Sequence, residues 1–514
     1  MGTGDIQLVS YGEEDKYIMG NPQITFFKSV YRKHTNFAIE SIKQEFSGTI
    51  GFGQRVGCTL AKNGDLIHKI YLEVDINKFS LPISPKVHLG HALIKDVNIE
   101  IGGQEIDKHY SQWLQVWNEL SNPDYNNTVV TTTPTTNIYV KDTDSDKTDI
   151  YWSKSQIALG TTIDRVIQLE GQVNDSISQG VEVAYADCGY RRMVGDMGYN
   201  LIPSNKLEEA NGIKLYIPLQ FWFCRNPGLA LPLIALQYHD VEINVTIEDS
   251  KNLFGETEYD IIPSDSDLDI VMWVDYIFVD ENERKRFAKM KHEYLIEQVQ
   301  FSGEQLMRSG SINKYYLNFN HPVKEIIWAT NVNSEDEAIV KNASNITQFG
   351  PKYKNLSCHF SRLSNGREKD ATVHLEMDGH ARFTKRNMSY FTRVQPHQHH
   401  TNIPLNDRIG TYSFALDPEE HQPTGTCNFS RIESTVMTFD FTNQNATDID
   451  YSTLEDKKAI YRELTYSNNQ EPGISTGTSN TINAKSNIGK VFIFATNYNI
   501  LKIMSGMGGL MYSN

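Results

Sequence analysis

The stretch HDVEINVTI at residues 239–247 carries aliphatic side chains on alternate positions, with polar residues between them. Side chains on a β-strand point to opposite faces in turn, so this spacing gives the segment one apolar face and one polar face. The run IYLEVDI at residues 70–76 shows the same period of two. Such alternation is typical of antiparallel sheets that pack one face on a core and expose the other to water.

The same pattern recurs along the chain, between stretches that are rich in turn residues. The further strands that we expect are Ile270–Asp280, Leu295–Phe301, Tyr315–Phe319, Val323–Thr330, Thr372–Met377, Thr435–Thr442 and Val491–Ile503. Helical spacing is confined to three short candidates, which are Lys108–Leu120, Glu281–Lys291 and Leu454–Leu464. Many strands with few helices predict an all-β fold of sandwiches or barrels.

Two polar stretches, Asn122–Asp149 and Tyr466–Ser486, hold few residues that a core could bury. We expect both to be long surface loops. The basic helix near Glu281 is the expected boundary between two halves, because one run of strands ends before it and another begins after it. Each half then has about the size of one large β-sandwich.

Composition and charge exclude several classes of protein. The 514 residues, of which 39% are hydrophobic and 11% aromatic, can form more than one buried core and are not disordered throughout. A net charge of -16 repels phosphate, so direct nucleic-acid binding is not expected. The sequence shows neither an apolar run of ~20 residues, as a membrane span needs, nor a secretory signal. Five scattered cysteines without a CxxC pair indicate buried thiols in a reducing compartment.

Five long blocks spread over nearly the whole chain carry a more specific pattern. They cover residues 4–38, 217–243, 274–301, 412–432 and 494–514. The first reads GDIQLVSYGEEDKYIMGNPQITFFKSVYRKHTNFA and the last reads FATNYNILKIMSGMGGLMYSN. Together these blocks resemble the major capsid proteins of the nucleocytoplasmic large DNA viruses. Because the blocks are long and occur in order, chance agreement is negligible.

The resemblance implies an all-β fold of two consecutive eight-stranded antiparallel jelly-roll sandwiches, with a few short helices and long surface loops. Residues 1–25 would form an N-terminal segment at the base of the capsomer. Residues 26–287 would form the first jelly roll, with long inserted loops at about 122–192. Residues 288–514 would form the second jelly roll.

The resemblance also implies a structural function without enzymatic activity. Three chains around a threefold axis would give six barrels, a pseudo-hexagonal capsomer that tiles an icosahedral virion shell. The expected partners are further copies of the chain, minor capsid and penton proteins and, indirectly, the internal membrane, with assembly in the host cytoplasm. The alternative class is an all-β carbohydrate-binding or carbohydrate-active protein, which would need paired carboxylates or an aromatic platform.

Two acidic motifs resemble functional sites only in part. Asp142, Asp144 and Asp146 have the spacing of calcium-loop ligands, but Lys147 replaces the required glycine, so we expect a solvated loop. The run Asp417–Glu420 offers carboxylates for glycoside hydrolysis. Neighbouring residues on one loop seldom face each other across a substrate, and we expect a structural loop there.

Three further motifs also favour structural interpretations. His397, His399 and His400 lie in QPHQHH, where adjacent side chains point apart, so we expect an exposed or interface loop rather than a metal site. The basic residues within 284–291 predict a solvated helix face between two domains. Residues 506–509, GMGG, lack the Lys-Ser/Thr of a phosphate loop and predict a tight backbone path beside a strand. We therefore predict no catalytic, cofactor-binding or metal-binding residues and no cofactor.

Overall fold

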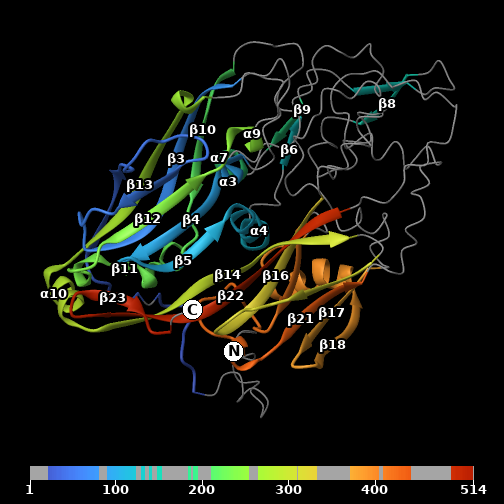
Figure 1. Cartoon of the computed structure of the whole chain (residues 1–514). Helices are drawn as coiled ribbons and strands as arrows, with labels where there is room; N and C mark the ends of the chain where they lie inside the picture. Colours follow the sequence, from blue (N-terminus) through green and yellow to red (C-terminus); the bar gives the residue numbers. More distant parts are fainter. Residues whose placement is uncertain are drawn as a thin grey trace, which may run out of the picture.

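The computed structural model is mainly β-sheet with few helices (Figure 1). It describes residues 21–29, 31–79, 89–122, 129–132, 138–141, 148–152, 183–186, 189–194, 210–253, 264–308, 311–332, 371–404, 409–440 and 488–512. The expected helix at 454–464, the expected loop at 466–486 and the aspartates at 142–146 lie outside these residues.

The first half of the chain forms two antiparallel sheets. One has the order β1-β13-β3-β10, with strands Phe37–Gln44, Leu268–Val279, Leu66–Phe79 and Ala210–Pro218. The other has the order β2-β12-β4-β5, with strands Arg55–Thr59, Val241–Ile247, Ile94–Ile101 and Gln104–Tyr110. A short strand, β11 (Leu231–Pro232), pairs with β3. The inner faces of the two sheets form one hydrophobic core.

The second half repeats this arrangement. One sheet has the order β14-β22-β16-β19, with strands His292–Arg308, Ile488–Met504, Pro322–Val332 and Ile409–Ser413. The other has the order β15-β21-β17-β18, with strands Ile312–Tyr316, Thr435–Asp440, Thr372–Met377 and His380–Asn387. Two short strands, β20 (Cys427–Asn428) and β23 (Met507–Leu510), pair with β16 and β22.

The two halves share one strand order. When the eight main strands of each half are numbered along the chain, one sheet reads 1-8-3-6 and the other reads 2-7-4-5. This is jelly-roll connectivity, in which each sheet alternates strands that are far apart in sequence. The predicted all-β fold of two eight-stranded jelly rolls is therefore confirmed.

Helices and short turns connect the strands. The α-helices are α3 (Leu89–Leu93), α4 (Ser111–Ser121), α7 (Gly189–Val194), α8 (Trp222–Arg225), α9 (Ser250–Leu253), α10 (Glu281–Lys289) and α13 (Gln395–His399). The 3-10 helices are η2 (Pro227–Leu229), η3 (Leu233–Ala235), η4 (Asp265–Asp267) and η8 (Phe429–Arg431), and η7 (Tyr390–Val394) is a π-helix. None of the helices in the described part of the chain is long and apolar enough to cross a membrane.

The region that was expected to be a loop at 122–149 contains strands. β6 (Val129–Thr132) pairs with β9 (Val183–Ala186), and β7 (Ile138–Lys141) pairs with β8 (Thr148–Trp152). The helix expected from Lys108 begins three residues later, because Lys108 to Tyr110 complete strand β5.

Helix α4 lies between the two jelly rolls (Figure 1). Its side chains Trp113 and Trp117 stack with ring centroids 5.5 Å apart, and Trp113 contacts Phe494 of β22. Spacing of four residues places both indoles on one side of the helix. The cluster around them joins α4 to Val299, Ile327, Ala329, Ile409, Phe492 and Phe494 of the second half.

Strand β22 is consequently buried on both faces. Val491, Ile493 and Ala495 face the core of the second jelly roll, whereas Phe492 and Phe494 face α4. Its far end continues into the core of the first jelly roll through Leu501 and Ile503. A sheet that is covered on both sides needs apolar residues at consecutive positions, which explains the run VFIFA at 491–495.

We predict that Trp113→Ala lowers the free energy of unfolding by about 3–5 kcal/mol, because a fully buried indole is removed and a cavity remains. Urea titration followed by fluorescence and circular dichroism measures the change. Tyr316→Ala, at a side chain that is 69% exposed, is the matched control and should change stability by less than about 0.5 kcal/mol. Equal midpoints for both variants would contradict the role given to α4.

Candidate functional site

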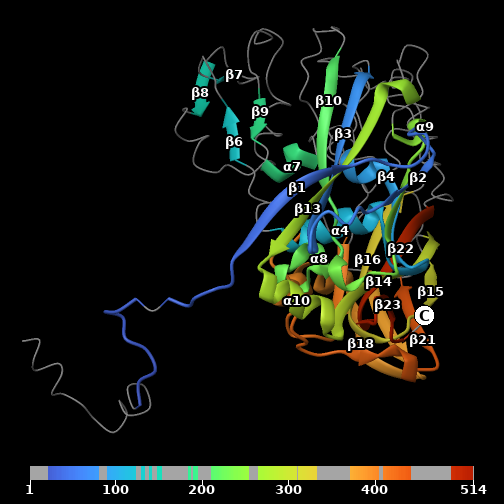
Figure 2. The same cartoon turned by 90° about the vertical axis from the view of Figure 1, so that its left-hand side faces the viewer.

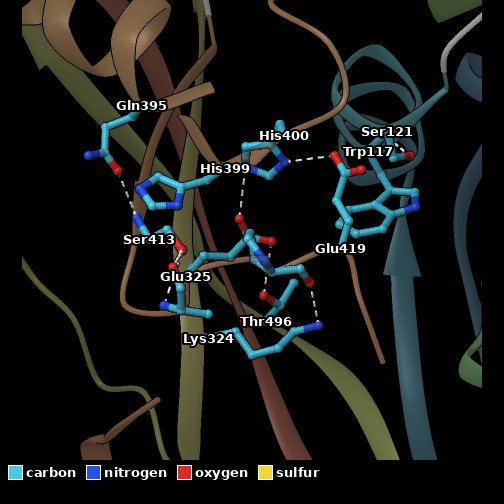
Figure 3. Close-up of polar contacts among 12 residues, drawn as sticks. Trp117, Ser121, Lys324, Glu325, Gln395, His399, His400, Ser413, Glu419 and Thr496 are labelled. Atoms are coloured by element: carbon cyan, nitrogen blue, oxygen red, sulfur yellow. Dashed lines mark hydrogen bonds and ion pairs between the residues drawn. The ribbon is translucent and has the colours of Figure 1, made fainter. Parts of the chain in front are cut away.

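A buried set of charged side chains lies beside α4, under the loop that follows β19 (Figure 3). β14 contributes Glu297, β16 contributes Lys324 and Glu325, and the residue after α13 is His400. Glu419 comes from the loop itself. Polar groups at such depth are costly unless they are paired, so their partners define what the set can do.

His400 bridges two carboxylates. Its Nε2 lies 3.0 Å from Glu325 Oε2, an ion-pair contact, and its Nδ1 lies 3.0 Å from Glu419 Oε1. The side chains of His400 and Glu325 are both 0% exposed. Thr496 of β22 donates a 3.2 Å hydrogen bond to Glu325 Oε1, and Thr401 donates its backbone N–H to Glu419. The imidazole therefore ties strand β16 to the loop.

Glu297 joins the two halves of the chain. Its Oε2 accepts a 2.9 Å hydrogen bond from Arg225 Nη1, and its Oε1 lies 2.8 Å from Lys324 Nζ. Arg225 belongs to α8 of the first half and stacks over the Trp117 ring at 4.7 Å. Lys324 also donates to the carbonyl of Pro418 at 2.6 Å. Glu297 is thus connected through Arg225 to α8 and α4, and through Lys324 to the loop.

The two carboxylates beside His400 favour its protonated form. Burial alone lowers the pKa of His400, but Glu325 and Glu419 more than offset this effect and raise the pKa to about 9. Burial lowers the pKa of Lys324, although the charge of Glu297 opposes this effect. Burial also lowers the pKa of His421. The contacts of the set join Arg225 and Lys324 to Glu297, and His400 to Glu325 and Glu419.

The loop at residues 416–424 is fastened from below by this set. His399 Nδ1 contacts the carbonyl of Leu416 at 2.7 Å, and the hydroxyl of Tyr498 donates to the carbonyl of His421 at 3.3 Å. Because Glu325 and His400 are closed off from solvent, a substrate has no access to them. The arrangement fixes a loop on the surface of the second jelly roll.

The structure brings together two motifs that the sequence analysis kept apart. His400 of QPHQHH binds Glu419 of the acidic run, while His399 turns to Leu416 and His397 is exposed. The stretch that we expected to be an exposed or interface loop is instead helix α13 up to His399, and the side chain of His400 after it is buried. Its second partner, Glu325, was not singled out by the sequence, because a single glutamate in a strand carries no motif.

Two of the four basic residues of α10 form ion pairs in the structure. Arg284 binds Asp65 through Nε at 2.9 Å and Nη2 at 3.0 Å, and Lys285 lies 2.6 Å from Glu281. Lys291, just after the helix, lies 2.9 Å from Glu293. These contacts support the prediction of a charged helix face between the halves.

The glycines after β22 form a tight hairpin, as predicted. Gly506 has φ +81°, and a Cβ at Gly508 would lie 2.7 Å from Leu236 of the first jelly roll.

Burial raises the pKa of the Cys58 thiol to about 11 and that of Cys224 to about 12, so both cysteines are poor nucleophiles at neutral pH.

Large apolar side chains are exposed on both halves of the chain. In the first half they include Phe26, Phe27 and Tyr31, which precede β1. In the second half they include Leu306, Ile312 and Tyr316, on β14 and β15. Contiguous exposed apolar groups mark surfaces that other molecules cover.

We predict that the His400 contribution to stability is lost in alkali. Because its folded pKa of about 9 lies above the ordinary 6.5, the contribution is complete below pH 6.5 and disappears as the pH rises through about 9. At ~1.4 kcal/mol per pKa unit, it amounts to about 3 kcal/mol. The measurement is the free energy of unfolding of the wild type between pH 6 and 10.

Two variants make this pH test specific. Glu419→Gln removes one of the carboxylates that raise the pKa of His400. In this variant the contribution of His400 to stability should therefore disappear at a lower pH than in the wild type. His400→Gln should be less stable at pH 7 and should lack the alkaline loss. If the wild type and His400→Gln changed in parallel across this pH range, His400 would not be the titrating group.

Comparison with known proteins gives a consistent match along the chain. A family model described as the major capsid protein N-terminus matches residues 25–280, and one described as the large eukaryotic DNA virus major capsid protein matches residues 283–461. The chain is 36% identical to the major capsid protein of Pyramimonas orientalis virus and 33% identical to that of Paramecium bursaria Chlorella virus 1, with 100% of both chains covered in each case.

Solved structures agree with the sequence match. A chain of a quasi-atomic model of the PBCV-1 virus capsid matches with a TM-score of 0.64 and 31% identity, covering 95% of this chain and 100% of that chain. The Faustovirus major capsid protein matches with a TM-score of 0.58 over 96% and 94% of the chains; at 14% identity it shows the shared fold alone. The chain therefore belongs to the family of major capsid proteins of large eukaryotic DNA viruses, and it is a structural component of the virion shell rather than an enzyme.

Proposed function

We propose that the chain forms homotrimeric, pseudo-hexagonal capsomers that tile an icosahedral shell. Membership in the family implies self-assembly into a capsid lattice. The observation that carries the finer proposal is the repeated strand order, 1-8-3-6 and 2-7-4-5, in both halves of one chain. Three copies around a threefold axis would present six similar sandwiches, which can fill a hexagonal lattice although each chain has a single sequence.

The proposal divides the chain into three parts. Residues 1–25 form a segment at the base of the capsomer, residues 26–287 form the first jelly roll and residues 288–514 form the second. The first jelly roll carries the inserted loops at about 122–192, of which Asn122–Asp149 lies on the outer face. The position of α10 between the last strand of the first half and the first strand of the second supports this boundary.

We further propose minor capsid and penton proteins as partners, with an indirect relation to the internal membrane and assembly in the host cytoplasm. An icosahedral shell of hexagonal blocks needs a different unit at its fivefold vertices, which supports a penton partner. The net charge of -16 supports the view that the chain does not bind nucleic acid directly.

The predicted soluble unit is a trimer, with three times the chain mass of 58.6 kDa. Multi-angle light scattering at micromolar concentration measures the mass, and negative-stain images should show hexagonal outlines. A stable folded monomer would contradict the proposal. A monomer whose melting temperature rises with a sugar would favour a carbohydrate-binding protein instead.

We predict that deletion of residues 1–21 leaves the trimer intact but abolishes incorporation into particles. The segment precedes the first strand, and its apolar residues need a covering surface. Thermal melting of the trimer and assembly with the remaining capsid proteins measure the two effects. Loss of the trimer would assign the segment to the fold itself, and normal assembly would make it dispensable.

Replacement of Thr131–Lys147 by a short Gly-Ser linker should leave the trimer mass and melting temperature unchanged. The stretch is rich in Thr and Asp and adds little to a core. The replacement removes β7, which pairs with β8, and the last two residues of β6, which pair with β9 of the same insertion. Loss of soluble trimer would show that the insertion packs against a neighbouring chain.

A further inference from the structure

The chain before β1 exposes an unusual series of aromatic and aliphatic side chains. Phe26 is 88% exposed, Phe27 is 98% exposed and Tyr31 is 81% exposed. Ile24, at 73%, begins the series, and Phe37 at the start of β1 is 54% exposed. We call residues 21–36 the arm. Such side chains normally lie in cores or interfaces, so the arm is a surface without its partner.

The arm runs away from the two jelly rolls (Figure 2). In the part of the arm that the structure describes, the hydrogen bonds are local. The Phe27 N–H donates to Thr25 Oγ1, and His34 Nδ1 contacts the carbonyl of Thr35. The ring of His34 lies 6.0 Å from that of Phe37, the next aromatic along the chain. These contacts all join residues that are close together in sequence.

Strand β1 continues the arm as an open edge. Among the described strands it pairs with β13 on one side and has no neighbour on the other. Its residues from Phe37 to Ser41 are exposed, and Ile39 is 53% exposed. An edge strand presents unpaired backbone N–H and C=O groups to which another chain can add.

The charge of this segment is opposite to that of the rest of the chain. Residues 21–39 contain Lys28, Arg32 and Lys33 and no carboxylate. With a net charge of -16 for the whole chain, the segment carries +3 and the remainder carries -19. A basic apolar segment and an acidic body repeated in every copy are complementary to each other.

We infer that the arm and the open edge of β1 dock on the acidic surface of a second copy of this chain. This inference rests on the proposed assembly into capsomers and a lattice, and it names the segment that makes one of the contacts. Phe26 and Phe27 would supply buried area, and Lys28, Arg32 and Lys33 would meet carboxylates of the neighbour.

A second copy fits better than an anionic membrane. Aromatic and basic residues together also suit a lipid surface, but the body behind the arm carries -19 and is repelled by anionic headgroups. In a shell built from this chain, by contrast, an acidic neighbour is always present. The lipid surface is therefore the competing outcome of the test.

Zero-length carbodiimide cross-linking of the full chain tests the inference, because it joins an amine to a carboxylate only when they touch. We expect a covalent dimer at twice 58.6 kDa, in which mass spectrometry finds Lys28 or Lys33 linked to Asp or Glu. Lys28→Arg/Lys33→Arg keeps the charge and lacks the amines, so these links should disappear while the sedimentation coefficient of the capsomer stays unchanged.

Two variants test the contact itself. Phe26→Ser/Phe27→Ser should reduce the cross-links of Lys28 and Lys33 at least five-fold; both rings are exposed on the single chain, so its circular dichroism spectrum should not change. Arg32→Glu keeps both lysine amines and should reduce the cross-links at least three-fold. Tyr316→Ser, an exposed aromatic on the second jelly roll, is the matched control and should leave them unchanged.

Several results would overturn the inference. Lys28 and Lys33 linked only within the monomer band would mean that the arm docks on its own chain. An unlinked arm, combined with flotation on phosphatidylserine vesicles that Phe26→Ser/Phe27→Ser abolishes, would make lipid the partner. A trimer without arm-linked dimers contradicts this inference alone, whereas a monomer without any covalent dimer contradicts the proposed function as well.

Discussion

The burial of α4 between the two jelly rolls is the constraint on which much of the structure depends. Trp113 and Trp117 pack on the outer face of the β14-β22-β16-β19 sheet, so that its strand β22 is buried on both faces at residues 491–495. The edge of this sheet is covered as well, since Asp107 of β5 accepts a 3.0 Å hydrogen bond from the backbone N–H of Val299 in β14. The second jelly roll has its own core, and the cluster around α4 joins its outer face to the first half of the chain. The two sandwiches therefore stabilise each other.

A sheet that is enclosed in this way imposes strict conditions on its polar residues. Glu297, Lys324 and Glu325 are each less than 10% exposed, and each is paired with an opposite charge. A buried ion pair adds little stability over a well-packed apolar pair, but its directional contacts restrict which arrangements are possible. Here they determine where the loop at 416–424 lies and how α8 meets β14. The charged set thus contributes specificity at the junction of the halves.

The sequence predicted the parts of the fold that depend on local periodicity. Alternation predicted β12 and β13, and the expected strand Val491–Ile503 lies within β22, because a strand pattern needs only its own residues. The helix at Lys108 was placed too early, since β5 passes directly into α4 and aromatic residues suit both. The contact of His400 with Glu325 joins residues that are 75 positions apart, and only the jelly-roll connectivity brings them together. Such pairs leave no local signal.

Self-assembly of this chain has to overcome its own charge. Each copy carries -16, and like charges at close range oppose association, although salt limits their reach to about 10 Å. Attraction must therefore come from short-range contacts: exposed apolar groups such as Phe26 and Phe27, and local basic groups that meet carboxylates. Short-range attraction with weak long-range repulsion favours defined contacts over indiscriminate clustering, because only correctly oriented copies bring the attractive surfaces together. An acidic capsid protein can in this way remain soluble until its specific surfaces meet, and its charge serves assembly by making every other approach unfavourable.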